Sequence, residues 1–142
     1  MKTTVLNHVK AMRRIISYLE NHGRTVTETP QLRKKDKIDF YLDGISCKFK
    51  MCKYGQVNII FEILNGRNSG WFKDSKAELF VYYIKETKMV YLIDIDATRK
   101  YCSENVLKMT SKGMSGNGLA YLIPIMVLQR EGLIKEEVGV KR

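Results

Sequence analysis

Residues 37–64 read KIDFYLDGISCKFKMCKYGQVNIIFEIL, and the alternation within this stretch decides the fold class. Ile38, Phe40 and Leu42 alternate with polar residues, which is the period-2 pattern of a half-buried strand. The dipeptide at 43–44, Asp-Gly, is favoured in two-residue hairpin turns. The same alternation continues over 45–51, and a further apolar run covers 58–64. The stretch therefore predicts three consecutive strands, the first two joined by a tight turn.

The turns predict which residues lie opposite each other. A turn at 43–44 places Asp39 opposite Lys48. A three-residue loop over Lys53, Tyr54 and Gly55 would pair the second strand with the third and place Ser46 opposite Glu62. Both hairpins put the apolar residues on one face, so the two turn assignments agree. The opposite face then collects Asp39, Tyr41, Ser46, Lys48, Lys50, Asn58 and Glu62.

The remaining elements follow from periodicity and capping. Apolar residues at helical spacing predict a helix over 4–21, followed by a short strand and a basic loop over 24–37. Asp74 or Ser75 can cap a helix that reaches about residue 84, with Glu78 completing a capping box after Ser75. A strand over 89–95, a helix over 97–107, a strand over 119–125 and a short helix over 125–130 complete the order. The expected fold is a single α/β domain over 1–142, with a mixed β-sheet that includes an antiparallel three-stranded meander and is flanked by helices.

Composition excludes several classes of protein. The chain has 142 residues, about the length of one domain. Its three cysteines show no Cys-x-x-Cys motif, and no apolar run is long enough for a membrane span or a signal peptide. These features exclude a disulfide-rich secreted scaffold, a membrane protein and a structural zinc ribbon, and they favour a cytoplasmic location.

Net charge is the abnormal feature. Lys and Arg total 25 against 15 acidic residues, which gives +10 and a pI near 9.6, and the first 53 residues hold 12 of these cations against 5 acids. A surplus of this size is typical of proteins that bind nucleic acid. A ribosome-associated or merely soluble basic protein is the alternative. The residues expected to hold the phosphate backbone are Arg33, Lys34, Lys35, Lys50 and Lys53.

Asp39, Lys48 and Glu62 form the candidate catalytic group. Two carboxylates beside a lysine are what a metal-dependent phosphodiesterase requires, because carboxylate oxygens hold Mg²⁺ or Mn²⁺ and the ion activates water. The lysine would orient that water or stabilise the developing charge. The alternative is a cross-strand ion pair on a solvated face, which is common and contributes little.

Three segments resemble the PD-(D/E)XK nuclease superfamily. They are residues 37–63, residues 68–95 (NSGWFKDSKAELFVYYIKETKMVYLIDI) and residues 118–125 (GLAYLIPI), and the resemblance extends over roughly 5–125. It is greatest to the small phage- and restriction-type members and to Holliday-junction resolvases. The resemblance implies a restriction-endonuclease-like core and Mg²⁺-dependent cleavage of DNA.

The resemblance also implies roles for single residues. Asp39 matches the family aspartate and Lys48 the motif lysine, while Ser46 stands where the family has a carboxylate. Glu62 would supply that missing metal ligand. Ser75 and Lys76 match a (Ser/Thr)-Lys-Ala helix start, and a helix N-terminus favours phosphate.

Two functions therefore remain open. The first is a metal-dependent DNA endonuclease or resolvase-like enzyme of the kind that phages and mobile elements encode, acting in the host cytoplasm. The second is a non-catalytic basic DNA-binding module on a decayed nuclease fold. A protein-interaction or inhibitor protein explains the charge less well. Either favoured function has DNA as its partner and no membrane, and a homodimer is left open.

Overall fold

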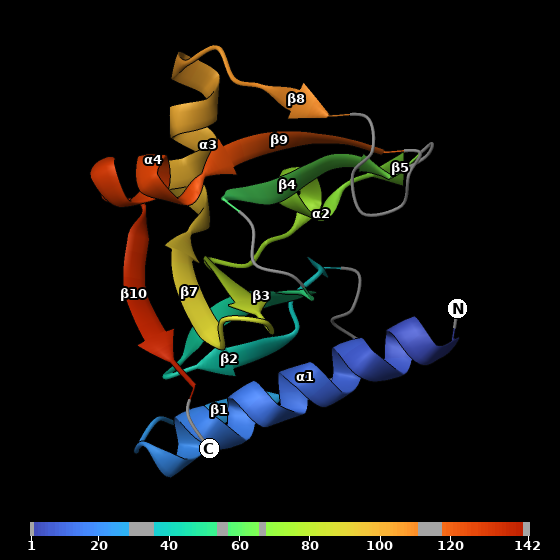
Figure 1. The fold of residues 1–142 in the computed structure, drawn as a ribbon, viewed down its shortest axis with the longest axis vertical. Helices are drawn as coiled ribbons and strands as arrows, with labels where there is room; N and C mark the ends of the chain where they lie inside the picture. The colour runs from blue at the N-terminus through green and yellow to red at the C-terminus, as the bar shows by residue number, and fades with distance from the viewer. Residues whose placement is uncertain (1, 29–35, 54–56, 66–67, 111–117, 141–142) are drawn as a thin grey trace.

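The computed structural model describes residues 2–28, 36–53, 57–65, 68–110 and 118–140 (Figure 1). Sheet A has the strand order β1-β2-β3-β6-β7-β10, and sheet B has the order β5-β4-β9-β8. Within these residues, no helix is both long and apolar enough to cross a bilayer. The strands are β1 (Val26–Glu28), β2 (Phe40–Leu42), β3 (Ile45–Cys52), β4 (Asn58–Asn65), β5 (Asn68–Ser69), β6 (Leu79–Ile84), β7 (Met89–Asp94), β8 (Met109–Thr110), β9 (Gly118–Pro124) and β10 (Ile134–Gly139). The helices are α1 (Lys2–Asn21), α2 (Trp71–Asp74), α3 (Ile95–Glu104) and α4 (Ile125–Arg130).

The first predicted hairpin is confirmed in its register. Phe40 lies opposite Cys47, and Leu42 lies opposite Ile45. Asp43 and Gly44 have φ values of 51° and 84°, the left-handed conformation that a type I′ turn requires at both central positions. β1 pairs with the other edge of β2, so an antiparallel meander does exist, but it consists of β1, β2 and β3.

The second predicted hairpin is wrong. β3 pairs in parallel with β6, which places Lys48 beside Phe80 and Lys50 beside Tyr82. β4 instead pairs with β9 in sheet B, with Glu62 opposite Ala120. Local alternation identifies each strand, but it carries no information about a parallel partner some 30 residues further along the chain. Of the predicted loop, Tyr54 and Gly55 lie outside the described residues.

The helix predicted to begin at residue 74 or 75 is also wrong. Asp74 ends the short helix α2, and residues 79–84 form strand β6, whose residues are all buried. The sequence of a strand that is covered on both faces is a continuous apolar run. Its periodicity does not distinguish it from a buried helix. The other predicted helices and strands lie close to their expected bounds, and α2, β5, β8 and β10 were not predicted.

Sheet A is covered on both faces by different layers, as Figure 1 shows. On one face α1 packs through Ile15 and Leu19 against alternate residues of the sheet, such as Phe49 and Tyr83. On the other face sheet B and the remaining helices pack against the intervening residues, such as Phe80. Each strand of sheet A therefore divides its side chains between the α1 side and the sheet B side.

We expect Asp94→Ala to destabilise the protein by about 1 kcal/mol, because an N-cap side chain satisfies a backbone donor of its helix. The Asp94 carboxylate accepts the Ala97 N–H at 2.9 Å. Urea unfolding measures the loss. Ser103→Ala in the same helix is the control, since the Ser103 hydroxyl is exposed and bonds only the Lys100 carbonyl three residues back. Equal stability of the two variants would contradict the capping role.

Candidate active site

The site is built on an edge of β3 that β2 leaves open. β2 lies opposite residues 45–47 only, so residues 48–52 extend past it. The carbonyls of Ser46 and Cys52 point toward β6 and accept the N–H groups of Glu78 and Lys85 at 2.9 and 2.8 Å. The carbonyl of Cys47 points the other way and accepts the Asp39 N–H at 2.8 Å. By this alternation, the peptide groups of Phe49 face the open edge.

Side chains replace the missing strand at Phe49. Its N–H donates to Asp39 Oδ2 at 2.6 Å, and its carbonyl accepts from His8 Nε2 at 3.3 Å. The His8 ring also meets the Phe49 ring edge-on, with 5.3 Å between centroids. Burial lowers the pKa of His8 below its ordinary value, which favours the neutral imidazole. The backbone thus fixes the orientation of the Asp39 carboxylate.

Lys48 and Lys50 lie on the sheet B side of β3, beside the aromatic residues of β6. Lys48 Nζ is 3.5 Å from Asp39 Oδ2, and the two side chains are only 15% and 23% exposed. Burial lowers the pKa of Lys50, and the charge of Lys48 lowers it further. The charges of Glu62 and Asp39 act in the opposite direction. Both candidate carboxylates therefore lie within electrostatic reach of one partly buried ammonium group.

Glu62 reaches this cluster from sheet B. The residue is 4% exposed, and its carboxylate accepts no hydrogen bond from the described residues. The backbone of Gly70 packs directly against it: a Cβ at position 70 would lie 2.4 Å from the Glu62 carbonyl oxygen and 2.8 Å from its Cγ. The Gly70 N–H also donates to the neighbouring Ile63 carbonyl at 2.6 Å. Only glycine allows this approach, which positions Glu62.

Of the two predicted pairs of cross-strand neighbours, the structure contains one. Asp39 and Lys48 are neighbours, as the first hairpin required. Ser46 and Glu62 are not cross-strand partners, because Ser46 lies opposite Tyr41 and its hydroxyl accepts the Glu78 N–H at 3.0 Å. Sequence reasoning missed His8, since a lone histidine on a helix carries no signal that it will meet a strand edge 41 residues away.

The residues predicted to bind phosphate differ in their exposure and in their contacts. Arg33, Lys34 and Lys35 lie outside the described residues, and Lys53 is exposed just after β3. Ser75 is buried; its hydroxyl donates to the Lys37 carbonyl at 2.7 Å and accepts the Ala77 N–H at 3.1 Å. Lys76 is exposed, with Nζ 3.7 Å from Asp36 Oδ1. Because no helix begins here, the expected anion site at a helix N-terminus does not form.

The donor chemistry fits a hard divalent cation. Asp39 and Glu62 supply carboxylate oxygens, and Mg²⁺ is often held by one or two carboxylates together with several waters. Among the described residues, no group of three or more His, Cys, Asp or Glu side chains is placed to hold a metal ion. Burial raises the pKa of the Cys47 thiol to about 12, as expected for a core residue rather than a nucleophile.

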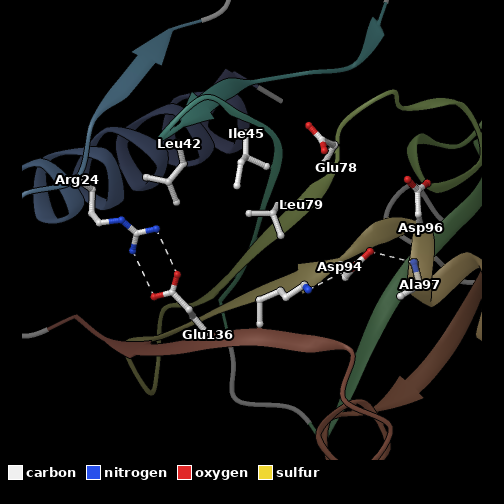
Figure 2. Close-up of a pocket in the computed structure, with 10 residues that line it drawn as sticks. Arg24, Leu42, Ile45, Glu78, Leu79, Asp94, Asp96, Ala97 and Glu136 are labelled. Carbon is white, nitrogen blue, oxygen red and sulfur yellow. Dashed lines mark hydrogen bonds and ion pairs between the residues drawn. The ribbon is translucent and has the colours of Figure 1, made fainter.

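A separate, acid-rich pocket lies where α3 begins, between β3, β6 and β10 (Figure 2). Its two cations are already paired: Arg24 bonds Asp43 at 2.6 Å and Glu136 at 3.2 Å, and Lys135 lies 3.7 Å from Asp94. Figure 2 shows the Arg24 guanidinium directed at Glu136. Both cations of this pocket are therefore neutralised by carboxylates of the same chain.

We expect Gly70→Ala to displace β4 at Glu62 and to cost about 1–3 kcal/mol, the usual range for overpacking. Urea unfolding measures the free energy. The control is Gly139→Ala, where the new Cβ would meet only Met89 Sδ at an ordinary 3.7 Å. A Gly70→Ala protein as stable as the control would show that Gly70 does not position Glu62.

Comparisons with known proteins support the fold. No protein-family model matches the sequence, and no curated protein sequence does. Among solved structures, the chain is similar to the bacterial homing endonuclease I-Ssp6803I, with a TM-score of 0.55 and 16% sequence identity. The match covers 93% of this chain and 88% of that one. The chain therefore shares, over nearly its whole length, the fold of a bacterial homing endonuclease.

Proposed function

We propose that this protein is a DNA endonuclease that hydrolyses phosphodiester bonds at the cluster around Asp39. The observation that carries the proposal is the convergence of Asp39, Lys48, Lys50 and Glu62 from both sheets, with both carboxylates acting on the partly buried Lys50. The same fold in a homing endonuclease and the net charge of +10 both favour DNA as the substrate.

In this proposal, Asp39 and Glu62 hold Mg²⁺ or Mn²⁺. When bound, such an ion polarises the phosphoryl group and lowers the pKa of a coordinated water. The Phe49 N–H holds one Asp39 oxygen, which leaves Oδ1 as the free ligand atom. Lys48 and Lys50 balance the negative charge that develops on the phosphoryl oxygens. Their low exposure strengthens this effect, because charges interact more strongly away from bulk water.

We also propose a superfamily for this endonuclease. Lys48, which matches the motif lysine, lies beside Asp39 as the first hairpin requires. This pair supports a divergent member of the PD-(D/E)XK superfamily in which Glu62 replaces the carboxylate that is missing at Ser46. A phage or mobile-element origin, a resolvase-like preference for branched DNA and a cytoplasmic location are parts of the proposal that rest on the sequence and its resemblance alone, and a homodimer is left open.

One observation favours a second function, that of a non-catalytic DNA-binding module. Lys48 stands directly beside Asp39, where a second carboxylate would be the better metal partner, and its ammonium neutralises Asp39 at 3.5 Å. An ion pair of this kind needs no metal to be stable. Cleavage assays on variants of these two residues separate the two functions.

Asp39→Asn should abolish Mn²⁺-dependent cleavage of plasmid DNA while leaving binding intact or slightly tighter. The amide keeps an acceptor for the Phe49 N–H but removes the charge that a metal ligand needs. Gel assays of nicking and anisotropy with labelled duplex measure the two properties. Asp96→Asn is the matched control, because the Asp96 side chain is 80% exposed and pairs only with Arg99 on its own helix. Undiminished cleavage by Asp39→Asn would exclude this site.

Lys48→Ala should slow cleavage by roughly 10²–10³, the scale for losing one electrostatic stabiliser of a transition state. Lys48→Glu tests the binding-module alternative more sharply, because it places a carboxylate beside Asp39 and keeps Lys50. Cleavage that appears only in Lys48→Glu would identify a decayed site. Ser46 is unsuited to this test, since its buried hydroxyl bonds the Glu78 backbone.

A further inference from the structure

A groove runs along α1 on the side of sheet A that faces away from sheet B. Two adjoining hollows of about 140 and 550 Å³ form it, and they share Arg14 and Tyr83 in their walls. One wall is α1 from Asn7 to Asn21, a length of about 21 Å at 1.5 Å per residue. The other wall includes Lys85 and Lys88.

The groove carries positive charge that nothing in the described structure neutralises. The described residues that line it include Lys10, Arg14, Lys85 and Lys88, and none of them carries a carboxylate. None of these four side chains makes an ion pair or a hydrogen bond with the described residues. The pocket in Figure 2 provides the contrast, because there each cation faces a carboxylate of the same chain. The groove is therefore complementary to an anion supplied from outside.

Tyr83 gives the groove a polar floor. The residue is 2% exposed and lines both hollows, and its hydroxyl makes no hydrogen bond within the described residues. The hydroxyl is not fully enclosed, so it meets the open space of the groove, where solvent or a ligand can accept its hydrogen bond. Its ring packs in the core against α1, which leaves only the hydroxyl to meet a ligand. An unpartnered donor beneath four cations is suited to a phosphate oxygen.

We propose that this groove binds successive phosphates of one DNA strand, with Arg14 and Lys88 on the backbone and the Tyr83 hydroxyl donating to a phosphate oxygen. The inference rests on the proposed function, which makes DNA the partner. Placement supports it: Met51 in the groove wall follows Phe49, whose peptide groups meet Asp39 and His8 at the open edge of β3. A strand that leaves the Asp39 cluster around this edge enters the groove.

The test measures duplex binding by the full-length chain with a chelator present, so that no cleavage occurs. The slope of log affinity against log salt, between about 50 and 200 mM, falls by about 0.9 for each lost phosphate contact. Arg14→Gln/Lys88→Gln should reduce the slope by about 1.8. Lys100→Gln/Lys108→Gln removes the same charge from exposed positions outside the groove and should leave the slope unchanged.

Tyr83→Phe keeps the ring and removes only the hydroxyl. It should weaken binding by at least about ten-fold, because a hydrogen bond to a charged phosphate oxygen is lost. The slope should not change, because the hydroxyl itself carries no charge. Thermal unfolding of Tyr83→Phe should match that of the wild type.

The outcomes separate this inference from the proposed function. Equal slopes for the groove variant and its control would overturn the groove, even if Asp39-dependent cleavage is present. A slope loss confined to the groove variant would establish the groove, even if no metal supports cleavage. Absence of duplex binding by the wild type would overturn both.

Discussion

The hydrogen bond from the Phe49 N–H to the Asp39 carboxylate is the contact on which the rest of the site depends. β2 ends after covering three residues of β3, so the next peptide group would be an unpaired sheet edge. Exposed edges invite pairing with other strands, and proteins block them. Here a carboxylate and the His8 imidazole satisfy the peptide while leaving the edge open. The hydrogen bond that follows the last β2–β3 pair therefore also fixes the orientation of Asp39, the candidate metal ligand.

The second layer of the fold completes the cluster. Sheet B packs on the face of sheet A that presents Lys48 and Lys50, and it brings Glu62 from a strand that does not pair with β3. Gly70 makes the approach possible, because any side chain there would collide with Glu62. The charged groups therefore lie at the seam between the two sheets. Burial at such a seam depresses the pKa of Lys50 and makes its interactions with Asp39 and Glu62 stronger than on an open sheet.

Short-range features of the sequence predicted the first hairpin and α1. The Asp43-Gly44 turn determined the register that brings Asp39 and Lys48 together, and the apolar spacing of residues 4–21 identified α1. Contacts between distant segments could not be obtained in this way. The run LFVYYI at 79–84 fits a helix or a buried strand equally well. Its partner β3 is parallel, so no hairpin turn joins the two strands and no turn sequence predicts that they pair. Glu62 was placed in the candidate site as a cross-strand neighbour of Ser46, a register that the fold does not use, and its charge acts on Lys50 from sheet B instead.

Paired and unpaired cations lie in different parts of the molecule. Arg24 and Lys135 are neutralised inside the molecule, in the pocket that gathers most of the neighbouring acids. The cations of the α1 groove have no such partners in the described structure, and that groove ends beside the edge where Asp39 is held. Pairing of internal charges costs a protein little, whereas four like charges along one groove repel each other and destabilise the free protein. That repulsion is relieved when a polyanion binds, so in the proposed function the groove and the carboxylate cluster act as two parts of one surface, which meet at the open edge of β3.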